Sequence, residues 1–370
     1  MSSAIPFTQY KLGDILLKNR LVMAPMTRGR AIDNQPNELM AEYYTQRSSA
    51  GLIISEGIAP SPNGLGYARM PGIYSAEQIA GWKKVTQAVH AKGGKIFAQL
   101  MHCGRMSHPL NVPEGGKIVA PSAIASGTDM WTDQQGMLPA PVPEAISTAA
   151  IPLTIDEFVQ AAENAITAGF DGVELHSANG YLLEQFMSPG SNHRSDAYGG
   201  SIEKRARMVL EVARAVSQRI GTGKTAIRIS PFGTAGGMEV YEEIAQAYQY
   251  LAAELQQLGL VYLHITDNSS AGVPDVPLSL KQSIRKLFRN TLILSGSYGY
   301  DMERAEEDLS TGLANLIALG RPYISNPDLK ERLQNNWPLA EPASASTYYA
   351  GTAKGYTDYP VYKEQPVLAY

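Results

Sequence analysis

Eight short apolar runs rich in Val, Ile and Leu recur along the 370-residue chain, and this rhythm constrains the fold more than any other feature. The runs are nearly continuous in apolar character rather than alternating, which is typical of strands covered on both faces, as in a parallel sheet. The runs occupy residues 20–24, 51–55, 95–100, 171–175, 224–230, 261–266, 291–295 and 314–319. The pattern therefore predicts eight buried strands.

The segments between the runs have helical periodicity and recognisable ends. Residues 75–91 open with Ser75, an N-cap residue, and stop before Gly93. Residues 154–168 begin with TIDE, a capping-box pattern that places Glu157 at the third helical position. Further helices are expected over residues 201–219 and 241–257.

Strand and helix alternating eight times predict an α/β fold, a single (β/α)8 TIM barrel over residues 1–370. An open, doubly wound sheet is the alternative, and the count of eight favours the barrel. The length alone would allow two domains, but barrels of this class run beyond 250 residues as one domain. Residues 101–151 are rich in Pro, Gly and Ser, and we expect them to cap the barrel mouth. Residues 338–370 are expected to form an irregular tail.

Composition excludes several classes of protein. The 31 Lys and Arg against 35 Asp and Glu leave a net charge of −4, so nucleic acid is not an expected partner. No run approaches the roughly 20 apolar residues of a membrane span, and the N-terminus has no signal-peptide pattern. One cysteine cannot form an intrachain disulfide, a Cys-based zinc site or an iron–sulfur site. We expect a cytoplasmic protein without a metal.

Polar residues and glycines stand where the apolar runs end, and active sites of this fold lie at the carboxyl ends of the strands. These residues are Pro25, Met26, Thr27, Arg28, Glu56, Gly57, Gln99, His176, Asn179, Arg228, Gly296, Ser297, Gly320 and Arg321. The glycine turns after the last two strands match the recurrent phosphate site of barrels, where backbone N–H groups face an anion. Ordinary turn glycines are an equal alternative for these positions.

Gln99 and Arg228 lie at or near the ends of buried runs. A glutamine offers both a donor and an acceptor, which matches the edge of a heterocycle that contains an imide. A buried cation needs a partner. For Arg228 that partner is either an internal carboxylate, such as Glu56 or Asp267, or a ligand that develops negative charge.

His176 and Asn179 stand three residues apart at the end of the fourth run, followed by Tyr181. In a helical turn the first two side chains face the same way and can donate to one oxygen. The phenol of Tyr181 is a suitable proton donor. The remaining histidines are expected to be structural; these are His90, His102, His108, His193 and His264.

The chain resembles the Old Yellow Enzyme family of flavin-dependent ene-reductases, and the resemblance runs almost from end to end. The motifs that carry it are LKNRLVMAPMTR (17–28), AQLMHCGR (98–105), FDGVELHSANGYLLEQFMSP (170–189), NHRSDAYGGSIEKRAR (192–207), ALGRPYISNPDL (318–329) and GYTDYP (355–360). The pattern is most similar to the bacterial branch that reduces nitroesters, N-ethylmaleimide and enones. With Thr27 the chain resembles the branch of the family that has Thr at this position, whereas the other branch usually carries Cys there.

The resemblance implies a non-covalent FMN at the barrel mouth. By matching motifs, Thr27 would bind flavin O4, Gln99 the pyrimidine edge, and Arg228 the N1 and O2 atoms, where charge gathers on reduction. The residues that would line the flavin are Pro25, Met26, Thr27 and Gly57, and those that would hold its phosphate are Gly296, Ser297, Gly320 and Arg321.

The resemblance also implies a substrate site. His176 and Asn179 would bind the carbonyl or nitro oxygen of the substrate, and Tyr181 would be the proton donor. Tyr67 and Tyr349 match pocket tyrosines of the family. Met101 departs from the family, because many relatives carry Trp there; a flexible thioether replaces a rigid ring, so we expect this position to alter pocket shape and substrate preference.

The implied reaction has two steps at one site. NAD(P)H reduces the flavin and leaves; an activated alkene (an enone, enal, maleimide or nitroalkene) then receives hydride from flavin N5 at Cβ and a proton from Tyr181 at Cα. NADPH is favoured over NADH as the donor, and the protein is expected to be a monomer or a homodimer. Two other functions are weighed against this one: a flavin-free aldolase or isomerase of a phosphorylated sugar, and a flavin-binding protein without turnover.

Overall fold

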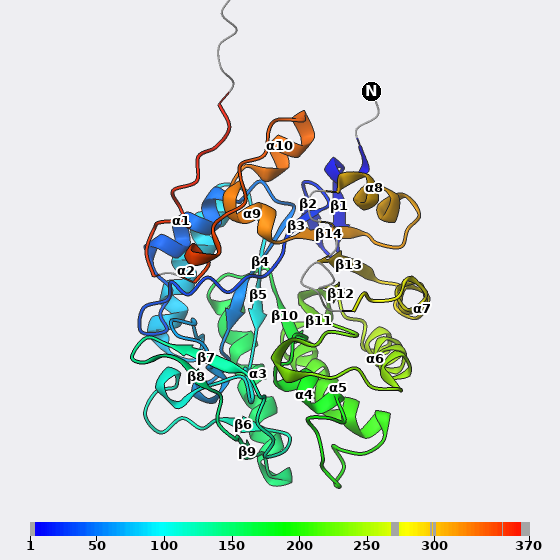
Figure 1. Cartoon of the computed structure of the whole chain (residues 1–370). Coiled ribbons are helices and arrows are strands. Elements are labelled where there is room, and N and C mark those ends of the chain that lie inside the picture. Colours follow the sequence, from blue (N-terminus) through cyan, green and yellow to red (C-terminus); the bar gives the residue numbers. More distant parts are fainter. Residues whose placement is uncertain (1–3, 268–273, 297, 299–300, 350, 364–370) are drawn as a thin grey trace, which may run out of the picture.

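The computed structural model describes residues 4–267, 274–296, 298, 301–349 and 351–363, and its eight central strands close into a parallel barrel (Figure 1). The barrel strands are β3 (Leu21–Met23), β4 (Leu52–Ile58), β5 (Ile96–Leu100), β10 (Gly172–Ser177), β11 (Thr225–Ile229), β12 (Tyr262–Thr266), β13 (Thr291–Ser295) and β14 (Leu316–Leu319). The last strand pairs with the first in the register Ile317 to Leu21, which closes the ring. The predicted barrel is confirmed, and the open sheet is excluded.

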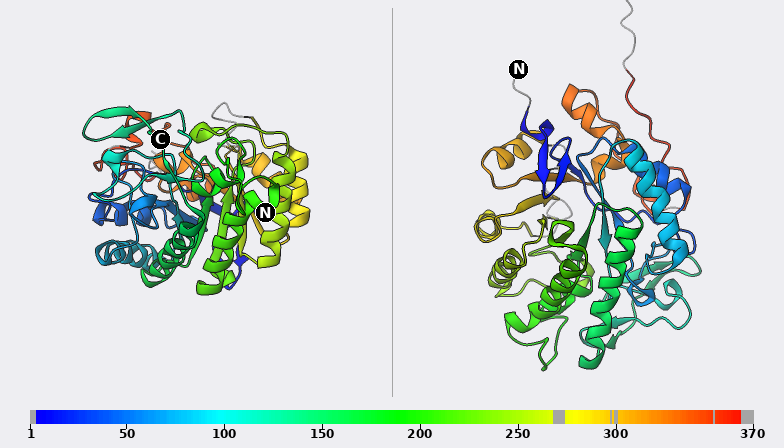
Figure 2. Two further views of the ribbon diagram at one scale, coloured as in Figure 1. Left: turned by 90° about the horizontal axis from the view of Figure 1, so that it is seen from below. Right: turned by 180° about the vertical axis from the view of Figure 1, so that it is seen from behind.

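Helices surround the barrel, as Figure 2 shows from two further directions. They are α1 (Glu38–Gln46), α2 (Ala76–Ala91), α3 (Ile151–Thr167), α4 (Leu182–Met187), α5 (Ile202–Ile220), α6 (Ile244–Leu258), α7 (Leu278–Leu287), α8 (Met302–Ser310), α9 (Arg321–Ser325) and α10 (Leu329–Asn335). Ser75 caps α2 as predicted, in a capping box with Gln78. The capping box expected at Thr154 is wrong, because α3 begins three residues earlier and Thr154 lies inside it. Pro152 is the reason, since proline is pre-organised for the first turn of a helix.

Apolar side chains fill the barrel itself as well as the layer between barrel and helices. Inside the barrel, the rings of Phe97 and Tyr262 lie with their centroids 5.6 Å apart. Leu12 and Leu17 join this inner cluster from a hairpin, β1 (Tyr10–Leu12) and β2 (Ile15–Leu17). The lower part of the barrel is therefore a packed core, and space for a ligand is left at the carboxyl ends of the strands.

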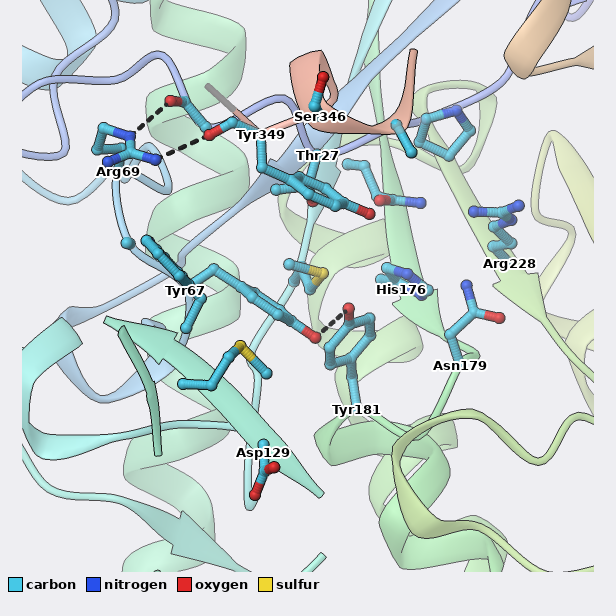
Figure 3. A pocket seen from close by; sticks show the side chains of 18 residues that line it. Thr27, Tyr67, Arg69, Asp129, His176, Asn179, Tyr181, Arg228, Ser346 and Tyr349 are labelled. Atoms are coloured by element: carbon cyan, nitrogen blue, oxygen red, sulfur yellow. Dashed lines mark hydrogen bonds between the residues drawn. The ribbon is translucent and has the colours of Figure 1, made fainter. Parts of the chain in front are cut away.

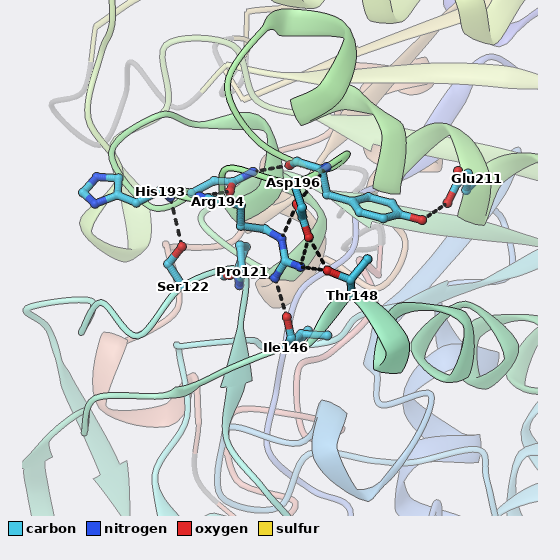
Figure 4. Close-up of polar contacts among 10 residues, drawn as sticks. Pro121, Ser122, Ile146, Thr148, His193, Arg194, Asp196 and Glu211 are labelled. Carbon is cyan, nitrogen blue, oxygen red and sulfur yellow. Dashed lines mark hydrogen bonds and ion pairs between the residues drawn. The ribbon is translucent and has the colours of Figure 1, made fainter.

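The segment between β5 and α3, predicted to cap the mouth, carries four short strands. They are β6 (Val119–Ala120), β7 (Asp129–Thr132), β8 (Gly136–Pro139) and β9 (Glu144–Ala145). Arg194, from the loop before α5, anchors the segment by donating to the carbonyl oxygens of Pro121 and Ile146 while it pairs with Asp196 (Figure 4). Hydrogen bonds to a buried guanidinium of this kind fix the course of an otherwise irregular loop.

Buried arginines hold the C-terminal tail against the barrel mouth. Arg28 donates to the carbonyl oxygens of Tyr348 (3.0 Å) and Gly355 (2.8 Å). The ring of Tyr356 stacks on Tyr43 of α1 at a centroid distance of 4.0 Å. The tail, which includes Tyr349, is thus fixed at the edge of the barrel mouth. The division into one domain with a capping excursion and a tail stays a prediction.

No helix in the described part of the chain combines the length and the apolar character that crossing a membrane requires. Within the same residues, no group of three or more His, Cys, Asp or Glu side chains is placed to hold a metal ion.

Candidate active site

Two cavities adjoin at the carboxyl ends of the barrel strands, with volumes of about 670 and 470 Å³. Pro25 and Arg228 line both, so the two spaces meet at these residues. Of the residues singled out from the sequence, the larger cavity is lined by Pro25, Thr27, Tyr67, Gln99, Met101, His176, Asn179, Tyr181, Arg228 and Tyr349. The smaller is lined by Pro25, Met26, Arg228, Gly296, Gly320 and Arg321. Ser297 lies outside the described residues.

One wall of the larger cavity carries Tyr181, Tyr67 and His176 (Figure 3). The hydroxyls of Tyr181 and Tyr67 are 2.9 Å apart, and the Tyr181 ring meets the His176 ring edge-on at 4.9 Å. Burial, reinforced by the neighbouring Tyr67, raises the pKa of Tyr181 well above its usual value. Tyr181 therefore keeps its proton at neutral pH and can deliver it to a strong base.

His176, at the end of β10, is buried and neutral. Burial lowers its pKa well below the usual value, and the positive charge of Arg228 adds to this effect. Its Nδ1 atom has no hydrogen-bond partner within the described residues. A buried polar atom without a hydrogen-bond partner is costly, so this nitrogen indicates a position where a bound ligand would supply the partner.

Arg228 projects from β11 into the junction of the two cavities and is only 7% exposed. One terminal nitrogen donates to the Thr266 hydroxyl at 3.0 Å, while Nε has no partner in the part of the chain described here. Burial lowers the pKa of Arg228, and the charge of Glu174 opposes the shift. A cation with an unused N–H suits a ligand that becomes negative.

Neither carboxylate proposed from the sequence is the group that acts on Arg228. Glu56 accepts hydrogen bonds from Tyr44 and the Arg28 amide, and Asp267 accepts one from Lys281. The interpretation is corrected to Glu174 on the neighbouring strand β10, whose negative charge acts on Arg228 without a direct ion pair among the described residues. The sequence does contain Glu174 within a buried run, but the pairing of β10 with β11 is needed to connect it to Arg228.

A chain of buried polar groups crosses the barrel beneath the cavities. Gln99 Nε2 donates to Glu174 Oε1 at 2.8 Å, and Glu174 Oε2 lies 2.9 Å from His264 Nδ1. His264 Nε2 lies 2.8 Å from the Ser295 hydroxyl. Because Nε2 of Gln99 donates one hydrogen to a carboxylate, the orientation of the amide is set, and its carbonyl oxygen is left to accept from a ligand. His264, interpreted from the sequence only as structural, is part of this chain.

Glycine is required on the side of the smaller cavity. Gly296 has φ +104°, and a Cβ atom there would lie 1.5 Å from the Asp267 carbonyl oxygen. Gly320 and Arg321 follow β14 on the same side. Backbone that only glycine can form, next to an arginine, suits the close approach of a phosphate group.

The floor and the mouth of the larger cavity are formed by packing that the sequence did not make visible. Gly57 contacts Met101, since a Cβ at this glycine would lie 2.5 Å from Met101 Cε. At the mouth, Arg69 donates to the carbonyl oxygens of Gly29 (2.9 Å) and Tyr349 (2.8 Å). It also pairs with Asp133 of the β7–β8 hairpin. From the sequence Arg69 would be interpreted as an ordinary surface residue. Its partners lie 40 to 280 residues away, so no local pattern indicates its contacts.

The hairpin residues Trp131 and Met137 line the larger cavity while remaining about half exposed. They were expected only as part of the capping segment and were not predicted individually. Their apolar side chains extend the cavity wall outward, so the outer part of a bound molecule meets an apolar surface.

These groups fit the flavin mononucleotide that the resemblance implies. An acceptor at Gln99 suits the imide N–H of the isoalloxazine, and the Arg228 Nε–H, which has no partner among the described residues, suits its N1 and O2 edge. The glycine-lined cavity beyond Arg228 has room for the phosphate. The two adjoining cavities match a ligand with a flat ring at one end and an anion at the other.

Comparisons with known proteins agree with this site. Residues 6–340 match the model of the NADH:flavin oxidoreductase / NADH oxidase family. The chain is 43% identical to chanoclavine-I aldehyde reductase of Penicillium roqueforti over 95% of both chains. Among solved structures, it is similar to morphinone reductase in complex with tetrahydroNAD (43% identity, TM-score 0.91, 97% and 98% of the two chains). It is also similar to the old yellow enzyme homologue from Zymomonas mobilis (41% identity, TM-score 0.91, 96% and 99%).

Proposed function

We propose roles for the residues of this site from the premise that the chain belongs to the NADH:flavin oxidoreductase / NADH oxidase family and, within it, to the Old Yellow Enzymes. The protein is an oxidoreductase that uses FMN and a nicotinamide cofactor and acts on activated carbon–carbon double bonds. As substrates we propose enones, enals, maleimides, nitroalkenes and nitroesters. FMN, when bound, supplies the hydride that it has taken from the nicotinamide.

In this proposal the chain holds FMN through three kinds of contact. Thr27, Gln99 and Arg228 bind the edge of the isoalloxazine, supported by the acceptor oxygen of Gln99 and the unpaired Nε of Arg228. Other residues pack against the ring, namely Pro25, Met26 and Gly57. The phosphate is held by Gly296, Ser297, Gly320 and Arg321.

His176 and Asn179 donate to the carbonyl or nitro oxygen of the substrate, so that negative charge developing there is stabilised. Tyr181 gives its proton to the adjacent carbon, and the Tyr67 hydroxyl, 2.9 Å away, can then donate to the phenolate oxygen. Tyr67, Met101 and Tyr349 shape the space for the rest of the substrate. The convergence of His176, Asn179 and Tyr181 on the larger cavity is the observation that carries this proposal.

A Tyr181→Phe variant tests the proton donor. We expect reduction of the bound flavin by NAD(P)H to be spared and protonation of weakly acidic products to slow by about 10²–10⁴-fold, the usual worth of a general acid. Stopped-flow spectroscopy separates the two steps. Unchanged turnover of an enone would remove Tyr181 from this role.

A His176→Ala/Asn179→Ala variant tests the oxygen-binding pair. Wild-type holoenzyme should bind 4-chlorophenol with a long-wavelength charge-transfer band, and the double variant should lose this band. Persistence of the band would contradict the assignment. The colour of the purified protein distinguishes the other functions: colourless protein would indicate the flavin-free enzyme, and yellow protein that NAD(P)H does not bleach would indicate a binding protein.

NADPH as preferred donor, a cytoplasmic location and a monomeric or homodimeric state complete the proposal, which includes no nucleic-acid or membrane partner. The balanced charge and the single, buried cysteine support the location. Steady-state kinetics with both donors, cell fractionation and analytical ultracentrifugation test these points.

A further inference from the structure

We propose that Glu184 is a positioning residue that fixes the turn carrying Asn179 and Tyr181, an inference that rests on the roles proposed above for those two residues. Glu184 lies in α4, directly after this turn, and is 3% exposed. It is absent from the wall of the larger cavity, so it acts through the backbone of the turn rather than on a substrate.

The carboxylate of Glu184 reaches the Gly180 amide of the turn directly and the Asn179 amide through Ser230. Its Oε2 accepts from the Gly180 amide at 2.6 Å, and its Oε1 accepts from the Ser230 hydroxyl, also at 2.6 Å. The Ser230 oxygen in turn accepts from the Asn179 amide at 2.8 Å. Tyr248 of α6 donates a further hydrogen bond to Oε1 at 2.7 Å. One side chain thus ties the turn to β11 and α6 together.

The turn needs this support because its backbone is unusual. Asn179 has φ +57° and Gly180 has φ +80°, so two consecutive residues adopt the left-handed region. A Cβ atom at Gly180 would lie 2.4 Å from the Ala235 carbonyl oxygen, so the turn is also closely packed. Amides presented in this way are not paired by a helix or sheet, and the Glu184 network supplies their acceptors.

Burying a carboxylate at position 184 costs free energy of desolvation. This cost indicates that the arrangement of its acceptor oxygens is what the turn requires. In the described part of the chain, no Lys or Arg forms an ion pair with Glu184. Burial accordingly raises its pKa to about 7, even though three donors point to it. A neutral or apolar side chain would cost less to bury, but only a carboxylate offers acceptors to three donors at once.

Glu184→Gln is the central test, because it keeps the shape but places an NH2 group against a donor. We expect 4-chlorophenol to bind the holoenzyme about tenfold more weakly, as judged by the charge-transfer band, since a buried donor loses its acceptor. Hydrogen exchange at the amides of residues 179 and 180 should become faster. The amount of bound FMN should stay at the wild-type level, because Glu184 lines neither of the two adjoining cavities.

Two matched variants separate positioning from general stability. Ser230→Ala breaks the link to the Asn179 amide and should also weaken phenol binding, by about fivefold. Tyr248→Phe removes a donor to the same carboxylate without touching the turn, and phenol affinity should stay within about twofold of wild type. If Glu184→Gln does not fold, Ser230→Ala against Tyr248→Phe still tests the proposal.

Wild-type phenol affinity and wild-type amide exchange in Glu184→Gln would overturn the inference. Equal losses in Ser230→Ala and Tyr248→Phe would also overturn it, because they would indicate a structural role alone. The proposed function fails separately, if the His176→Ala/Asn179→Ala variant keeps the phenol band.

Discussion

Glu174 and Glu184 are both buried beside the same catalytic segment, yet their acidities move in opposite directions. Burial raises the pKa of both. For Glu174 this effect is overcome by the charge and hydrogen bond of His264 and by the charge of Arg228, so its pKa lies below the usual value. Among the described residues Glu184 meets hydroxyl and amide donors without a cation, and its pKa rises to about 7. Equal burial therefore has opposite results, and the neighbouring charge decides between them.

The two carboxylates serve the two halves of the site differently. Glu174 carries a fixed negative charge between Arg228 and the Gln99 amide, on the side where we propose the flavin. Glu184 holds a backbone turn on the side where we propose the substrate. One group thus contributes mainly charge balance and the other mainly shape, which three changes can test.

Arg228→Met should have the largest effect, because it removes a buried cation whose charge favours ionised Glu174 and whose guanidinium donates to Thr266. Removal of a hydrogen-bond partner from a buried group costs about 1–3 kcal/mol, and more where the group left behind is charged. We expect a loss of this order in the free energy of unfolding and loss of FMN on gel filtration. Arg228→Lys, which keeps the charge, is the control. A Met variant that retains FMN and wild-type stability would show that Arg228 does not balance Glu174.

The pH dependence of stability should differ between the two carboxylates. The folded pKa of Glu184, about 7, exceeds its unfolded value of 4.5, so stability from this group is lost as pH rises between these values. Relative to Glu184→Gln, the wild-type free energy of unfolding should fall by about 3 kcal/mol from pH 4.5 to 7.5. For Glu174, whose folded pKa is lowered, stability should instead be lost as pH falls below its unfolded value. Urea unfolding at several pH values measures both, and identical slopes for wild type and Glu184→Gln would contradict the contrast.

Glu174→Gln should have the smallest effect of the three changes and should act on the flavin. Without the carboxylate, the Gln99 amide is no longer held in one orientation, and we expect about tenfold weaker FMN binding. The flavin midpoint potential should shift to more positive values, because a negative charge beneath the ring is removed. Fluorescence titration and a redox titration provide the two measurements. An unchanged potential would argue that Glu174 acts only on orientation.

Much of the architecture was predictable because buried parallel strands and their helices leave local signals. The eight apolar runs correspond to the eight barrel strands, and Ser75 caps α2 as its sequence indicates. The start of α3 was misjudged, because the TIDE pattern competes with Pro152 and the proline prevails. Helix ends depend on such local competition, which periodicity alone does not resolve.

The roles of Glu174, His264 and Glu184 could not be predicted in the same way. Each sits in an ordinary strand or helix segment, and its partners lie far along the chain: Tyr248 is 64 residues from Glu184, and His264 is 90 from Glu174. No local pattern encodes such a contact, because it exists only after the strands have closed into a ring.

The sequence by itself determined the strand–helix order, the barrel and, through its motifs, the residues around the proposed flavin and substrate. The strand–helix order and the site residues can be predicted because they depend on periodicity and on residue type at strand ends, both of which are local features of the sequence. Only the tertiary structure decided which carboxylate's charge acts on Arg228 and which one holds the turn at Asn179. The physical reason is that charge balance and hydrogen bonding inside a barrel depend on neighbours across the sheet, and closure of the barrel chooses those neighbours.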